Sequence, residues 1–174
     1  MILIEHRAPR TAPADAMLEL PFDLRCKSRL RTQLTGGEEV GLFLERGSVL
    51  RDGDKLRAGD GRIVAVRAAD EAVQVCRSAD AVLLARAAYH LGNRHVPVEV
   101  RPGELRFPQD AVLADMVKGL GLTVELVAAP FEPESGAYEG GHRHAANPGS
   151  DWAPGRARIH DKFHERPDVN EMTD

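Results

Sequence analysis

Apolar and polar residues alternate along much of the first 70 residues, which is the pattern of strands with one buried face. In the longest such run every second position is apolar or small: Leu18, Leu20, Phe22, Leu24, Cys26, Ser28 and Leu30. Two further strand-like runs cover 40–44 and 63–66. Turn signals containing glycine separate the runs, at 36–37, 52–53 and 59–61. We therefore predict an all-β domain over residues 1–70, built as a small sandwich of two antiparallel sheets.

Four basic residues occupy alternate positions from the second half of the longest run to the position after its end: Arg25, Lys27, Arg29 and Arg31. Such a row is typical of a solvated sheet face, where charges also discourage pairing at an edge. Docking of an acidic partner is the alternative. The two cysteines, Cys26 and Cys76, lie in strand-like runs without disulfide or zinc spacing, so we expect buried, reduced thiols.

From about residue 71 the pattern changes to strands alternating with helices. Strands are expected at 73–76, 96–100, 104–107 and 123–127, with one helix at 78–91 and another after Asp110. Asp110 is placed to cap the second helix and Gly121 to end it. The order β-α-β-β-α-β is that of the ferredoxin-like arrangement, so residues 71–131 predict a domain of this type and the whole chain an α+β fold.

Beyond Pro130 the chain has few large apolar residues and many prolines, glycines and charges. Such a segment buries too little surface to offset the entropy of ordering it. We expect residues 132–174 to form a flexible tail that contains histidines.

The best-placed candidate for chemistry is His95, at the corner where the first helix meets the next strand. Ser78 is placed to cap that helix, and Gly92 to end it in a left-handed conformation. Asn93 is expected to shape the turn. Neutral imidazole is the commonest metal-binding side chain. Spacing alone, however, leaves open a solvent-exposed histidine or one that donates a hydrogen bond to a carbonyl.

One imidazole does not hold a divalent cation tightly, but a two-fold dimer places two copies of the same residue across its axis. The tail adds His142 and His144, an i, i+2 pair that could assist as ligands or could be incidental polar residues. His90, in the last turn of the helix, is expected to be a supporting or structural residue. His160 and His164 have no accompanying ligand.

Composition narrows the classes of function. The chain of 174 residues has 43% hydrophobic residues and a formal net charge of -4, so it offers no bulk attraction to nucleic acid or to an anionic membrane. No apolar run approaches the roughly 18 residues of a membrane span, and the charged N-terminus is unlike a secretory signal. No phosphate loop, zinc-protease pair or nucleophile elbow is present in the sequence, so we assign no catalytic residues and expect a cytoplasmic protein that is not an enzyme.

Four stretches, in order along the chain, resemble motifs of the urease accessory protein UreE family of nickel metallochaperones: 41–47, 89–95, 112–116 and 130–138. The most specific is Tyr89-His90-Leu91-Gly92-Asn93-Arg94-His95. Together they extend the resemblance from about Ile2 to His144. Some family members carry histidines just before the motif at 112–116, where this chain has Gln109, Asp110 and Ala111, so we assign no peripheral site there.

The resemblance implies a homodimer that binds Ni(II) at His95 of each subunit, with His142 and His144 as tail ligands. It implies Zn(II) or Cu(II) as further ions in vitro, and delivery of nickel to the urease apoprotein with other accessory proteins, including a GTPase. It implies no nucleic-acid or membrane partner. The alternatives are a small metal-dependent hydrolase using His95, a general zinc- or copper-binding protein, and an RNA-binding module, which the scarcity of aromatic residues on the central strands disfavours.

Overall fold

The computed structural model describes residues 1–135, and the elements given below belong to that part of the chain. The first six strands are β1 (Ile2–Ala8), β2 (Ala16–Leu20), β3 (Arg29–Gln33), β4 (Glu39–Phe43), β5 (Lys55–Ala58) and β6 (Ile63–Ala68). They form one sheet, hereafter the N-terminal sheet, in the order β2-β6-β5-β1-β4-β3.

The prediction of two antiparallel sheets is wrong. β1 pairs with β4 on one side and with β5 on the other, and this joins strands that local hairpins would have left in separate sheets. Two of the pairs, β1 with β4 and β2 with β6, are parallel. The predicted turns are present: Gly37 and Gly61 have φ of 84° and 91° at the hairpins β3–β4 and β5–β6.

The long alternating run does not form one strand. Between β2 and β3 lies a one-turn helix, α1 (Phe22–Arg25), which starts after Pro21. The Pro21 carbonyl accepts the main-chain N–H groups of Leu24 and Arg25, so the chain turns where the alternation suggested that it continues. As a result Arg25 is fully buried, whereas Lys27, Arg29 and Arg31 are exposed. The predicted basic row therefore loses its first member.

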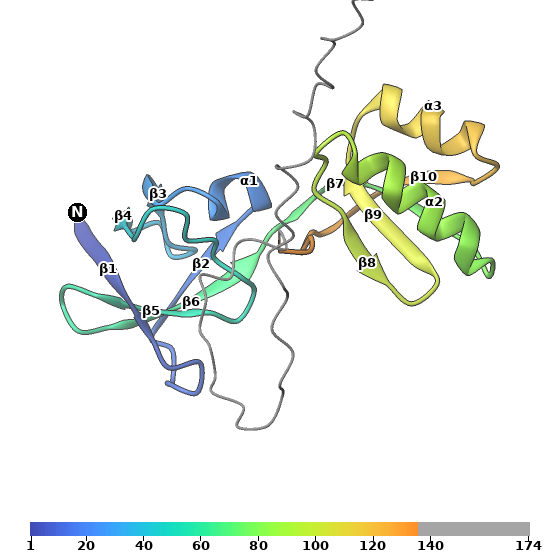
Figure 1. Cartoon of the computed structure of the whole chain (residues 1–174). Coiled ribbons are helices and arrows are strands. Elements are labelled where there is room, and N and C mark those ends of the chain that lie inside the picture. The colour runs from blue at the N-terminus through green and yellow to red at the C-terminus, as the bar shows by residue number, and fades with distance from the viewer. Residues whose placement is uncertain (136–174) are drawn as a thin grey trace, which may run out of the picture. The chain divides into compact units, whose positions relative to one another are not determined.

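The second sheet, hereafter the C-terminal sheet, has the predicted order of elements. These are β7 (Asp70–Arg77), α2 (Ala81–Gly92), β8 (Glu99–Arg101), β9 (Glu104–Pro108), α3 (Ala111–Gly119) and β10 (Val124–Pro130). The strands lie in the order β10-β7-β9-β8, and every neighbouring pair is antiparallel. Both helices lie on one side of this sheet (Figure 1).

Alternation along the C-terminal strands explains why two cores form. Cys76, Leu105 and Phe107 lie on the side of the sheet that faces the helices, where they pack with Leu91 of α2 and Val117 of α3. On the other side Val73 and Val75 pack with Phe131 and Phe22. Asp110 caps α3 by accepting the N–H of Leu113, and Gly121 follows the helix at φ 98°, as predicted.

Two further expectations concern the thiols and the tail. Cys76 is buried as expected, and burial raises the pKa of its thiol, but Cys26, which directly follows α1, is exposed. Of the predicted tail, only residues 132–135 belong to the described part, and the prediction for 136–174 lies outside it. Among the described helices, none combines the length and apolar character needed to cross a bilayer.

Candidate metal centre

The helix that leads to His95 is capped by Asp80, not by Ser78. The Asp80 carboxylate accepts the N–H groups of Val82 and Leu83 at 2.8 and 3.2 Å. Ser78 acts one step earlier, because its hydroxyl oxygen accepts the Asp80 N–H at 3.0 Å. The two side chains therefore form a relay that fixes the start of α2, and Ala81, the first residue of the helix, is exposed.

The helix does not end at Gly92 in a left-handed conformation. Gly92 belongs to α2, and Asn93 follows with a right-handed φ of -61°. The main chain continues to wind, because the N–H groups of Asn93, Arg94 and His95 donate to the carbonyls of Tyr89, Leu91 and Gly92. The left-handed residue is His95 itself, with φ 56°, and it is the only non-glycine residue with positive φ in the described part of the chain.

The segment after His95 is shorter as a strand than predicted. β8 begins only at Glu99, since Pro97 has no N–H to donate and the Val98 carbonyl accepts from Glu134 rather than from a neighbouring strand. Val96 and Val98 pack against the core under α2. We refer to residues 93–98, between α2 and β8, as the corner. Its Asn93, Arg94 and His95 are exposed, so the imidazole is accessible to solvent.

The side chains around the corner stabilise its helix side. The Arg94 guanidinium donates to the His90 carbonyl at 3.0 Å. The His90 ring, which is half-buried, meets the Tyr89 ring edge-on with centroids 5.4 Å apart. Neither contact involves an imidazole nitrogen of His90, and its supporting role stays a prediction.

One face of α2 is apolar and exposed. Val82 and Tyr89 are 68% and 65% exposed, and they lie two helical turns apart on the same face, with the exposed Ala85 between them. This stripe ends one turn before the corner. An apolar stripe beside an exposed imidazole suits contact with another protein surface.

Within residues 1–135, no three side chains of His, Cys, Asp or Glu lie close enough together to hold a metal ion. His6 lies in β1 of the N-terminal sheet, and Asp110 is used as the cap of α3. His142, His144, His160 and His164 lie outside the described residues. The described chain thus has one exposed imidazole at the corner, and residues 1–135 alone do not gather three such ligands there.

Sequence reasoning missed the residue that joins the two sheets, Arg25. Its guanidinium donates to the carbonyls of Leu20 and Leu50 at 3.1 Å each, and to the Phe131 carbonyl at 2.5 Å. It also forms an ion pair with the Glu132 carboxylate. The signal that could have identified it is Pro21, because a proline that favours a first helical turn breaks the alternation that placed Arg25 in solvent.

Comparison with known proteins identifies the family. The family model described as "UreE urease accessory protein, N-terminal domain" matches residues 3–69, and the one described as "UreE urease accessory protein, C-terminal domain" matches residues 71–166. A protein of Alkalilimnicola ehrlichii named urease accessory protein UreE is 56% identical over 140 residues, covering 80% of this chain and 86% of that protein.

Relatives with the same name in Burkholderia pseudomallei and Burkholderia thailandensis are each 61% identical, over 133 and 127 residues. These matches cover 76% and 73% of this chain, but only 64% and 60% of the two relatives, just under two thirds of their length. The match to the C-terminal family model includes the segment around His95. The chain belongs to the urease accessory protein UreE family.

Proposed function

We propose that this protein is a nickel metallochaperone in which His95 from each of two subunits binds Ni(II) across a homodimer interface. The observation that carries the proposal is the exposed imidazole of His95, held at φ 56° on a corner between regular elements. Imidazole nitrogen is a suitable ligand for nickel. The described part of the chain holds no group of three such ligands, which favours a site completed by another copy.

The apolar stripe on α2 supports a homodimer. Pairing two copies about an axis near the corner would remove Val82 and Tyr89 from water and bring the two His95 side chains together. We place this interface in a ferredoxin-like domain over residues 71–131, a proposal supported by the element order and the antiparallel order β10-β7-β9-β8. Residues 1–70 would form the N-terminal domain.

The mechanism is ligand exchange without the making or breaking of covalent bonds in a substrate. Two imidazoles leave open coordination positions on the ion, which water or His142 and His144 can occupy and leave in turn. A carrier needs such an open site, because a closed cage of four protein ligands would retain its metal. Zn(II) and Cu(II) use the same ligand type and are expected to bind in vitro.

The family assignment places the protein in urease maturation. We propose that it delivers nickel to the urease apoprotein in the cytoplasm, together with other accessory proteins that include a GTPase. The exposed Lys27, Arg29 and Arg31 are the basic side chains that we propose to contact such a partner.

The test is a nickel titration by calorimetry, with the solution mass measured alongside, for wild type, His95→Ala and His90→Ala. We expect about one Ni(II) per dimer for wild type, loss of the tight binding event in His95→Ala, and its retention in His90→Ala. A His142→Ala/His144→Ala double variant measures how much the two tail histidines contribute to nickel binding. Wild-type binding by His95→Ala would reject the corner as the site.

A further inference from the structure

Residues Phe131–Ser135, hereafter the strap, connect the end of β10 to elements of the N-terminal part. On that side the strap is held by two arginines. The buried Arg25 donates to the Phe131 carbonyl and pairs with the Glu132 carboxylate. Arg51 donates to the Pro133 carbonyl at 2.7 Å and to the Ser135 hydroxyl at 2.9 Å.

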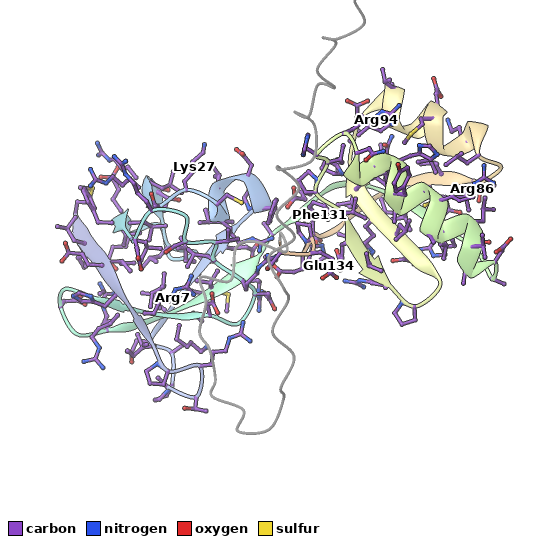
Figure 2. The ribbon with its side chains drawn as sticks, in the orientation of Figure 1. Arg7, Lys27, Arg86, Arg94, Phe131 and Glu134 are labelled. Atoms are coloured by element: carbon purple, nitrogen blue, oxygen red, sulfur yellow. The ribbon has the colours of Figure 1, made fainter. Side chains whose placement is uncertain are left out.

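On its other side the strap contacts the segment that leaves the corner. The main-chain N–H of Glu134 donates to the Val98 carbonyl at 2.8 Å. The main-chain N–H of Glu132 donates to the Glu99 carboxylate at 3.1 Å, and Glu99 is itself buried and paired with Arg101. Figure 2 labels Phe131 and Glu134 in the strap and Arg94 in the corner.

These contacts matter because the corner has an unfavourable backbone conformation. A non-glycine residue in the left-handed region persists when the surrounding structure fixes the chain on both of its sides. Before His95 the chain is fixed by the end of α2, and the Val96 N–H still donates back to Leu91. On the other side of His95, Val98 lies one residue before β8 begins. Its main-chain carbonyl accepts a hydrogen bond from the Glu134 N–H of the strap.

We propose that the strap is the positioning element of the candidate metal centre. The Glu134 N–H, held in place through Arg25 and Arg51, fixes the exit of the corner and so keeps His95 at its observed conformation. The consequence for nickel rests on the proposed function above. The positioning itself is a property of the metal-free chain and is tested without metal.

The experiment compares Glu134→Pro with Glu134→Ala in the full chain. Proline removes the N–H that donates to Val98, whereas alanine keeps that N–H and removes only the exposed carboxylate. We measure amide hydrogen exchange at His95 and Val96, with Val75 in the middle of the C-terminal sheet as an internal reference. Glu134→Pro should speed exchange at the corner about fivefold, as expected for one lost hydrogen bond, and Glu134→Ala should not.

A second variant, Arg51→Ala, releases the strap from the opposite side and leaves the Glu134 N–H intact, so it should speed exchange at the corner by a smaller factor. The proposal is overturned if the corner amides of Glu134→Pro exchange at the same rate as those of Glu134→Ala. It is also overturned if exchange at Val75 rises by the same factor as exchange at the corner, because the strap would then be a general structural support. The nickel titration is run in parallel, and Glu134→Pro should bind nickel about fivefold more weakly than Glu134→Ala.

The two hypotheses fail in different ways. If His95→Ala binds nickel like wild type, the proposed function fails, and the exchange rates still decide whether the strap positions the corner. If His95→Ala loses nickel while Glu134→Pro keeps both wild-type affinity and wild-type exchange, the metal centre stands and the strap has no part in it.

Discussion

His95 combines the candidate function with a backbone conformation that most residues avoid. Histidine is among the non-glycine residues found more often in the left-handed region, but the conformation still costs free energy. The sequence indicated Gly92 for this conformation, since glycine has no side chain to oppose it. The helix instead continues through Gly92 because Leu91 and Val96 pack into the core beneath it, and the left-handed step falls three residues later.

Two substitutions at His95 separate the effect of the imidazole on metal binding from the effect of the backbone conformation on stability. His95→Gly and His95→Ala both remove the imidazole and should both lose tight nickel binding. Glycine relieves the left-handed strain that alanine retains, so His95→Gly should have a free energy of unfolding about 1 kcal/mol higher than His95→Ala. Urea denaturation followed by circular dichroism measures the difference. Equal stabilities would mean that the corner changes its conformation when the imidazole is absent.

The elements of the C-terminal sheet could be predicted because their signals are local. Asp110, the periodicity of α3 and Gly121 lie within one stretch of sequence, and the structure confirms each of them. The start of α2 was misassigned because two polar residues that are two positions apart, Ser78 and Asp80, both suit a cap. Asp80 accepts the helix N–H groups, while the Ser78 hydroxyl accepts the Asp80 N–H. The periodicity of apolar residues does not distinguish these two roles.

The relay at the start of α2 gives a prediction for that helix. Asp80→Ala removes the acceptor for two N–H groups and should lower the free energy of unfolding by about 1 kcal/mol. Ser78→Ala leaves the Asp80 cap in place and should cost less than half as much. Thermal or urea unfolding of the two variants checks the order. A larger loss for Ser78→Ala would restore serine as the effective cap.

The N-terminal sheet shows where local pattern stops being informative. Its strands β4 and β6 and its glycine turns were predicted, but the pairing of β1 with both β4 and β5 joins residues that are far apart in the sequence. Likewise, the corner could be predicted from its helix and its motif. Its support by the strap could not, because the Glu134 N–H meets Val98 only in the folded chain. Sequence periodicity does not report such contacts.

The whole described chain is held together at Arg25, whose pairing with Glu132 joins residues 107 positions apart. The guanidinium is fully buried and donates to three carbonyls and one carboxylate, which no other side chain of its length can do in that planar geometry. Removing it would take this donor from the carbonyls of the buried Leu50 and Phe131 and break the ion pair with Glu132.

Arg25→Ala should therefore lower the free energy of unfolding by about 3 kcal/mol or more, the cost of breaking a buried charge pair. Arg25→Lys should recover only part of this loss, because an ammonium group does not reproduce the fork of donors. Arg29→Ala is the matched control: it comes from the same predicted basic row but is exposed, and it should cost less than about 1 kcal/mol. Urea denaturation with nickel absent compares the three variants. If Arg25→Ala and Arg29→Ala were equally stable, Arg25 would not be the residue that ties the strap, and through it the corner, to the N-terminal part of the chain.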